Sequence, residues 1–277
     1  MRHDNIKIPT LGGRQYWSDQ FIHAGWRIQK NIWMDHHRLL DPNDFRVAFG
    51  DWKTCRDCFD THEVSQRQPW PHEHLVILVH GLCRTKGAFY KMRKMLQEKG
   101  FSVQAINYPS TQQSTDKFVE QLNNLLSSLR GIAKVSFVTH SLGGIIVRKA
   151  LSEKRDWMEK LDIGDVIQIA PPNRGARIAN SFKDISLFQW GAGPAGTELA
   201  NGFDIDVPKT CANFHVIAGG TGTKRGFNPF LGCDNDGLVA IEETALTFPH
   251  AQHQFHAPHT LLINNPETLA LVNHVIN

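Results

Sequence analysis

A serine held between small residues is the feature of the sequence most suggestive of chemistry. Residues 134–144 form a short apolar, β-prone run that leads into Thr-His-Ser-Leu-Gly-Gly, with Ser141 at its centre. A serine on a sharp turn from a strand into a helix has its hydroxyl clear of the sheet, where it can act as a nucleophile. Because the turn is crowded, the residues two before and two after the serine should be small. Gly143 meets this rule and Thr139 meets it only in part, so an ordinary loop is the alternative.

A nucleophilic serine needs a histidine as its base, and the C-terminal part of the chain offers several. Histidines recur there at every third position: His250, His253, His256 and His259. Ala257 and Pro258 end the last strand that we expect, so His259 falls on the loop before the closing helix, where the base belongs. We therefore predict His259 as the base and the others as strand or rim residues. A metal cluster is the alternative, but a period of three does not place such side chains on one face of a strand.

The base in turn needs a carboxylate that orients it, and two aspartates compete for this role. Both lie in Gly-Cys-Asp-Asn-Asp-Gly-Leu-Val, residues 232–239, after an expected strand at 214–218. Asp236 is the better candidate, because Gly237 permits a tight turn after it and two apolar residues then return to the core. Asp234 is the rival, although it also fits an Asx turn.

Backbone amides would stabilise the oxyanion that forms when a serine attacks a carbonyl. We expect one from Leu142, directly after the nucleophile, and one from Leu82, on the loop after the first central strand. Gly81 would allow the substrate to approach closely. We also expect His80, Gly81 and His140 to contact the substrate.

The elements that must position these groups alternate between strand and helix from residue 75 onward. Apolar runs predict strands at 75–79, 101–106, 135–138, 166–170, 214–218 and 254–256. Helical spacing predicts helices at 87–99, 115–129, 142–151 and 266–276. Repeated alternation of this kind implies a mostly parallel, doubly wound sheet.

Two stretches interrupt this alternation. Residues 171–212 hold prolines, glycines and aromatics, and their length favours a cap or lid over the carboxyl ends of the strands rather than a plain connection. Residues 1–71 form an N-terminal extension, in which Trp17, Phe21, Ile28 and Ile32 lie near one helical face. We predict that this helix packs on the main domain, at 72–277, and is followed by edge strands around 45–52. Peripheral contact with a membrane, through this helix or the cap, is the alternative.

The amino-acid composition is typical of a globular protein. The 277 residues are 41% hydrophobic and 21% charged, and the net charge of +3 gives no case for nucleic-acid binding. The N-terminus lacks an apolar signal core and the five cysteines are an odd number, so we expect a reducing, cytoplasmic location. Cys55 and Cys58 form one C-x-x-C, without the second pair that a zinc site needs.

Together these motifs resemble lipase-like α/β-hydrolases, and most of all the branch that includes bacterial lipases and GPI inositol-deacylase-like hydrolases. The resemblance covers residues 72–277 and rests on motifs in the expected order: His80-Gly81, Thr139 to Gly143, Asp236-Gly237 and His259-Thr260. Ala-Pro-Pro-Asn-Arg-Gly at 170–175 and Asn-Pro at 228–229 also match. The threonine at 139, where glycine is usual, is a mild departure.

The resemblance implies an α/β-hydrolase fold and hydrolysis of carboxylic esters through an acyl-enzyme, with no metal and no cofactor. The substrate would be a small-molecule or lipid ester. An inactive scaffold that only binds, and an acyltransferase that uses the same residues, are the alternatives.

Overall fold

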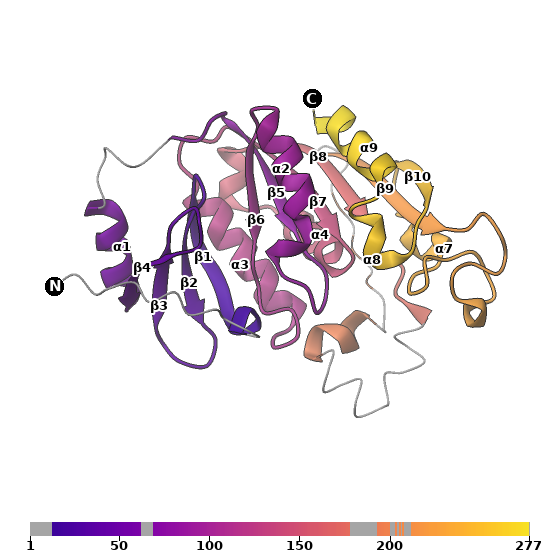
Figure 1. Cartoon of the computed structure of the whole chain (residues 1–277), viewed down its shortest axis with the longest axis horizontal. Coiled ribbons are helices and arrows are strands. Elements are labelled where there is room, and N and C mark those ends of the chain that lie inside the picture. The colour runs from indigo at the N-terminus through magenta and orange to yellow at the C-terminus, as the bar shows by residue number, and fades with distance from the viewer. Residues whose placement is uncertain are drawn as a thin grey trace.

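The computed structural model describes residues 13–61, 69–177, 193–199, 203, 205, 207 and 212–276 (Figure 1). They form two sheets: a six-stranded sheet with helices on both faces, and a smaller four-stranded sheet near the N-terminus.

The large sheet is parallel throughout, as the sequence predicts. Its order is β10-β9-β8-β7-β5-β6, and every neighbouring pair runs parallel. The strands are β5 (His74–Val79), β6 (Ser102–Ile106), β7 (Lys134–His140), β8 (Asp162–Ile169), β9 (Asn213–Gly220) and β10 (Ala251–His256). Parallel strands end at the same edge of the sheet, so the loops that follow them gather there.

Helices cover the sheet on both faces. The elements that follow β5 in the main domain are η2 (Lys86–Phe89), α2 (Tyr90–Glu98), α3 (Thr115–Ser128), α4 (Leu142–Ser152), η3 (Asp156–Glu159), η4 (Pro229–Leu231), α7 (Ile241–Thr244), α8 (His259–Leu262) and α9 (Pro266–Ile276). Helices α3 and α4 pack on one face, and α2 and α9 pack on the other.

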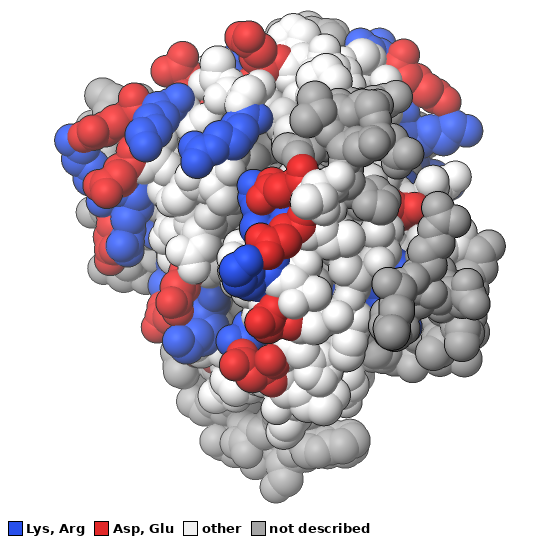
Figure 2. Space-filling view, turned by 90° about the vertical axis from the view of Figure 1, so that its left-hand side faces the viewer, with Lys and Arg blue, Asp and Glu red and all other residues white. Residues whose placement is uncertain are grey.

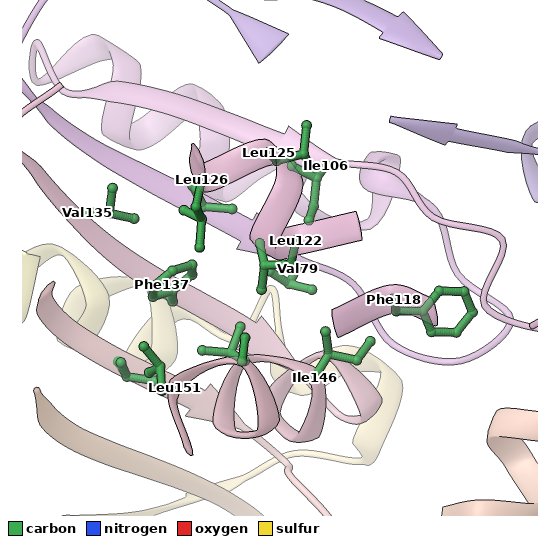
Figure 3. Close-up of a cluster of buried hydrophobic side chains, with 14 of the residues drawn as sticks. Val79, Ile106, Phe118, Leu122, Leu125, Leu126, Val135, Phe137, Ile146 and Leu151 are labelled. Atoms are coloured by element: carbon green, nitrogen blue, oxygen red, sulfur yellow. The ribbon is translucent and has the colours of Figure 1, made fainter. Parts of the chain in front are cut away.

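The alternation of side chains along β5 divides the core between these faces. Leu75, Ile77 and Val79 join one buried cluster, whereas Val76 and Leu78 join the other. This is the period of two that a strand imposes. Figure 3 shows the first cluster, in which side chains of α3 and α4 meet Val79 and strand β7. Each large apolar side chain that is fully buried contributes about 1.5–3 kcal/mol.

The N-terminal extension corrects our prediction of a helix with Trp17, Phe21, Ile28 and Ile32 near one face. The first three of these residues lie in strands, and the small sheet is antiparallel in the order β1-β2-β3-β4. Its parts are η1 (Gly13–Tyr16), β1 (Trp17–His23), β2 (Trp26–Asn31), β3 (His37–Leu40) and β4 (Arg46–Gly50), followed by α1 (Trp52–Thr61). Within the described residues 13–61, strands β1 and β2 therefore take the place of the helix that we expected to pack on the domain or lie on a membrane.

The reason for this error lies in the spacing of two apolar residues. Phe21 and Ile28 are seven residues apart, which places them on one face of a helix and also opposite each other in a hairpin. A two-residue turn at Ala24 and Gly25, both with positive φ (43° and 91°), selects the hairpin. Both side chains then lie in a separate small core with Cys55 of α1. Burial raises the pKa of the Cys55 thiol to about 11, so this cysteine acts as a packing group.

The outer side of the extension carries charges of both signs. Figure 2 shows the side of the molecule that lies on the left in Figure 1, where Lys and Arg side chains lie beside Asp and Glu. Helix α1 contributes two pairs at i,i+4 spacing, Lys53 with Asp57 and Arg56 with Asp60. Solvent screens such exposed pairs, so they add little to the stability of the fold.

The insertion at 171–212 is described only in part. Residues 193–199 form a short helix that packs on the main core through Ala195 and Leu199. Glu198 Oε2 accepts the Thr115 amide (3.1 Å) at the start of α3. Residues 178–192 and most of 200–211 lie outside the described residues, so a cap over the site stays a prediction. None of the helices in the described part of the chain has the length and apolar character needed to cross a membrane.

Ile28 and Ile32 are buried to different extents in the structure, although both would lie on the same face of a helix. Ile28 is fully buried, whereas Ile32, on the same face of a hypothetical helix, is only partly buried. We expect Ile28→Ala to lower the free energy of unfolding by about 2–5 kcal/mol and Ile32→Ala to cost less than half as much. Urea denaturation of both variants checks this. Equal losses at the two positions would contradict the strand assignment.

Candidate active site

Ser141 occupies a strained turn between a strand and a helix. Strand β7 ends at His140 and α4 begins at Leu142, so the serine is the single residue between them. Its φ of 52° and ψ of −121° are rare for any residue other than glycine. The Ser141 amide donates to the Ile169 carbonyl of β8 (2.9 Å), and its carbonyl accepts from the Gly144 amide (2.9 Å). Neighbouring backbone therefore fixes the turn.

The small residues around the serine are required by close contacts. A Cβ at Gly143 would lie 2.3 Å from the Val79 carbonyl oxygen and 2.8 Å from that of His80, so only glycine lets α4 approach the end of β5 this closely. Thr139 is fully buried, and its hydroxyl donates to the Ile167 carbonyl on β8 (3.3 Å). The threonine is tolerated because its side chain fills space between two strands and its hydroxyl is satisfied there.

His259 and Asp236 form a short, buried hydrogen bond. The distance from His259 Nδ1 to Asp236 Oδ2 is 2.7 Å, and the side chains are 9% and 1% exposed. The His259 amide also donates to the Asp236 carbonyl (2.8 Å). Because a carboxylate only accepts, Nδ1 carries the proton of the neutral imidazole and Nε2 is left with a free electron pair. This is the tautomer that a general base requires.

The carboxylate of Asp236 is itself held in place by backbone amides. Oδ1 accepts from the amides of Leu238 (2.9 Å) and Val239 (2.8 Å), and the Asp236 amide donates back to the Val239 carbonyl (3.1 Å). One oxygen thus fixes the loop while the other meets His259.

The alternative acid, Asp234, makes its hydrogen bonds within its own loop and to neighbouring backbone and side-chain groups. Its carboxylate accepts from the amides of Thr221 (2.8 Å), Gly222 (2.9 Å) and Asn235 (3.0 Å), and from the Gln254 side chain (3.1 Å). These contacts shape the loop that follows β9. The geometry favours Asp236 over Asp234 as the partner of the histidine.

The loop after β5 packs directly against the serine. A Cβ at Gly81 would lie 3.0 Å from Ser141 Cβ and 3.0 Å from His140 Nδ1. Leu82 follows on the same loop, and Leu142 is the first residue of α4, where backbone amides have no partner within the helix. Both predicted oxyanion donors thus belong to segments that flank the nucleophile, and their role stays a proposal.

His80 is fully buried beside the site, a placement that favours a supporting role over the substrate contact that we predicted. Its side chain is fully buried and stacks on the Tyr108 ring, with centroids 4.1 Å apart. His80 Nδ1 lies 2.9 Å from the Gly81 carbonyl oxygen, and the Tyr108 hydroxyl donates to the His80 carbonyl. Burial lowers the pKa of His80 to about 4, so the ring is neutral and can donate to Gly81 through Nδ1–H. The sequence analysis did not identify Tyr108 as part of the site. Its position just after β6, at the carboxyl end of a strand, was the feature that could have indicated it.

His140 connects the nucleophile turn to the histidine loop. It is 3% exposed, its Nε2 donates to the His259 carbonyl (3.1 Å), and the two rings are 4.8 Å apart. Burial lowers the pKa of His140 to about 3, so it stays neutral. This placement also argues against the predicted substrate contact and for a supporting role.

The structure therefore brings the predicted residues together at one edge of the sheet. Ser141 follows β7, Gly81 and Leu82 follow β5, Asp236 follows β9 and His259 follows β10. The other histidines lie in or beside β10, as predicted.

A family model described as "Domain of unknown function (DUF7379)" matches residues 45–201, more than half of the chain. The chain belongs to this family. Methylesterase 3 from Arabidopsis thaliana is 34% identical over 86 residues, which are 27% of this chain and 33% of that protein. The chain thus matches about a third of the length of this curated relative.

Solved structures with a similar fold include a lipase and a carboxyl esterase. The mature lipase BlEst2 from Bacillus licheniformis has a TM-score of 0.60 and 19% identity, covering 73% of this chain and 91% of that chain. The metagenomic carboxyl esterase MGS0156 has a TM-score of 0.55 and 17% identity, covering 73% and 75%. This protein has the α/β-hydrolase fold.

The contact at Gly143 predicts unequal effects of alanine at two adjacent helix positions. Alanine is intrinsically better than glycine in a helix by about 1 kcal/mol, so propensity alone favours both substitutions. A Cβ at Gly144 would meet side-chain atoms at 3.1–3.3 Å, whereas one at Gly143 meets backbone at 2.3 Å. We expect Gly143→Ala to lower the melting temperature by several degrees and Gly144→Ala to change it little. Thermal unfolding measures both melting temperatures. A melting temperature of Gly143→Ala equal to that of the wild type would contradict the close approach of α4 to β5.

Proposed function

We propose that this member of the DUF7379 family is a serine hydrolase that cleaves carboxylic esters. The observation that carries the proposal is the buried 2.7 Å hydrogen bond between His259 Nδ1 and Asp236 Oδ2, on loops that adjoin the strained turn at Ser141. Buried acid–histidine pairs beside such a turn are the arrangement that activates a serine hydroxyl. The names of the similar structures, a lipase and a carboxyl esterase, support the same chemistry.

The proposed reaction begins when Ser141 Oγ attacks the ester carbonyl carbon. His259 Nε2 accepts the hydroxyl proton as the new C–O bond forms, and Asp236 stabilises the imidazolium that results. Collapse of the tetrahedral intermediate breaks the bond to the alcohol, which leaves with the proton from His259. Water then attacks the acyl carbon while His259 Nε2 takes its proton. The bond from the acyl carbon to Ser141 Oγ breaks, Oγ regains the proton from His259, and the carboxylic acid is released.

The backbone amides of Leu82 and Leu142 stabilise the negative charge on the tetrahedral intermediate by donating hydrogen bonds to its oxyanion. Each such donor typically lowers the barrier by about 3–4 kcal/mol, because it is already oriented before charge develops. His80 and His140 contribute indirectly, since they hold the Gly81 carbonyl and the His259 carbonyl in place.

The substrate class is a small-molecule or lipid ester. The reaction as proposed draws all of its proton transfers and charge stabilisation from the chain's own side chains and amides, so it needs no cofactor.

Two aspartates and the serine provide the test of this proposal. We expect Ser141→Ala to abolish hydrolysis of p-nitrophenyl esters and Asp236→Asn to lower kcat by about 10⁴-fold, because the histidine loses its tautomer. Asp234→Asn is the matched control, since it removes the same charge two residues away. It should reduce stability while kcat stays within about tenfold of wild type, as expected for a group outside the reacting centre.

Steady-state kinetics and circular dichroism on the purified variants make these comparisons. Undiminished turnover by folded Ser141→Ala would refute the serine mechanism. A larger kcat loss for Asp234→Asn than for Asp236→Asn would reverse the assignment of the acid.

A further inference from the structure

The loop that carries the proposed oxyanion donor Leu82 is short and strained. We define the oxyanion loop as residues 80–86, which connect β5 to the start of η2. Cys83 has a positive φ of 56°, which disfavours a non-glycine residue. On its inner side, the Gly81 carbonyl accepts from the Arg84 amide (3.2 Å) and lies 2.9 Å from His80 Nδ1. A loop with such a backbone keeps its shape only if its surroundings determine it.

The first contact on the outer side comes from the segment just before β1. Gln15 Nε2 donates to the Arg84 carbonyl (2.7 Å), across 69 positions of sequence. Ser110 Oγ donates to Gln15 Oε1 (3.3 Å), which orients the amide. The middle of the oxyanion loop is thus tied to the N-terminal extension.

The second contact holds the end of the oxyanion loop. Lys86 Nζ pairs with both carboxylate oxygens of Asp44, at 2.7 Å for Oδ1. The Lys86 side chain is 13% exposed and that of Asp44 is 41% exposed. This partly buried pair is less screened by solvent than the Lys53–Asp57 pair of α1, in which both side chains are exposed. Asp44 lies in the turn between β3 and β4, where its amide donates to the Asp41 carbonyl (2.9 Å).

A buried polar network anchors the small sheet to the main domain behind these two contacts. Arg27 of β2 and Asp19 of β1 are fully buried, with Arg27 NH1 3.6 Å from Asp19 Oδ2. Asp19 and Asn107 exchange hydrogen bonds: the Asn107 amide donates to Asp19 Oδ2 (2.7 Å), and the Asp19 amide donates to the Asn107 carbonyl (3.0 Å). Asn107 directly follows β6, so the extension is fixed at the same edge of the large sheet as the site.

From these contacts we propose that the N-terminal sheet is a positioning element for the reaction, which sets the oxyanion loop through Gln15 and Asp44. The inference rests on the proposed function and extends it to residues 13–44, which precede the region that the family model matches. Asp44 and Gln15 are positioning residues, because they contact the loop and not the reacting atoms.

The expected effect is on kcat rather than on binding. Oxyanion donors act on the transition state, and a displacement of about 1 Å in catalytic geometry costs up to about 100-fold in rate. Ground-state binding depends on the substrate pocket and should change little. We therefore expect Asp44→Asn to lower kcat by about 10- to 100-fold and to leave KM within about twofold.

The pH profile gives a second readout that a purely structural role would not produce. Burial lowers the pKa of Lys86 to about 8, and Arg27, Asp44 and Asp19 are the charged groups that face it. As the pH rises through this value, Lys86 loses its charge and its pair with Asp44, so wild-type kcat should fall. Lys86→Arg keeps the charge throughout this range and should extend the plateau to higher pH. Asp44→Asn lacks the pair at every pH, so its lower kcat should show no further decline as the pH rises through this value.

The experiment compares Asp44→Asn, Lys86→Arg and Gln15→Met with a matched control, Asp35→Asn. Asp35 pairs with Lys30 (2.9 Å) beside the same sheet, but the pair is exposed and away from the oxyanion loop. For each full-length variant, kcat and KM for a p-nitrophenyl ester are measured from pH 6 to 10, together with the melting temperature and the rate at which a fluorophosphonate labels Ser141. The proposal expects kcat and labelling to fall together for Asp44→Asn and Gln15→Met, and to stay at the wild-type level for Asp35→Asn.

Two results would overturn the inference. One is a wild-type kcat and pH profile in folded Asp44→Asn or, if that variant does not fold, in Gln15→Met. The other is an equal kcat loss in Asp35→Asn, which would mean that any damage to the sheet has the same effect. If the wild-type protein itself shows neither ester turnover nor labelling of Ser141, the proposed function fails, and that outcome is distinct because it precedes any comparison of variants.

Discussion

The contact between the first turn of α4 and the end of β5 is the constraint on which the site depends. At Gly143 the helix backbone comes so close to the Val79 carbonyl that a Cβ has no room. The same crowded region holds Ser141 at its strained φ and packs Gly81 against the serine. The energy of the strained turn, about 1–3 kcal/mol, is offset by the large core behind it, where β5 and β7 meet α3 and α4.

Each group of the site is then held by a partner from a different part of the chain. His140 donates to the His259 carbonyl, and Asp236 joins its histidine while backbone amides hold its second oxygen. Tyr108 supports His80, which in turn holds the Gly81 carbonyl. Buried, neutral histidines suit this task because burial lowers their pKa values and leaves one ring nitrogen as a dependable donor. Preorganisation of this kind is what makes charge stabilisation in a site effective.

The parallel sheet and the residues gathered at its edge were predictable because their signals are local. Continuous apolar runs mark buried parallel strands, and the order of Ser141, Asp236 and His259 along the chain follows the order of the strands that carry them. The N-terminal sheet was not predicted, because Phe21 and Ile28 fit a helix as well as a hairpin and the turn at Ala24 and Gly25 was overlooked. The roles of His80 and of Asp44 could not be found from sequence, since their partners Tyr108 and Lys86 lie 28 and 42 positions away.

The proposed mechanism requires Ser141 to form a covalent bond with the acyl group of an ester. Intact-mass spectrometry of protein quenched in acid during turnover of an activated ester tests it most directly, with peptide mapping to locate the adduct. We expect a mass increase equal to one acyl group, confined to the peptide that contains Ser141 and absent from Ser141→Ala. Ester turnover with no adduct, or with the acyl group on another residue such as Cys83 on the neighbouring loop, would contradict it.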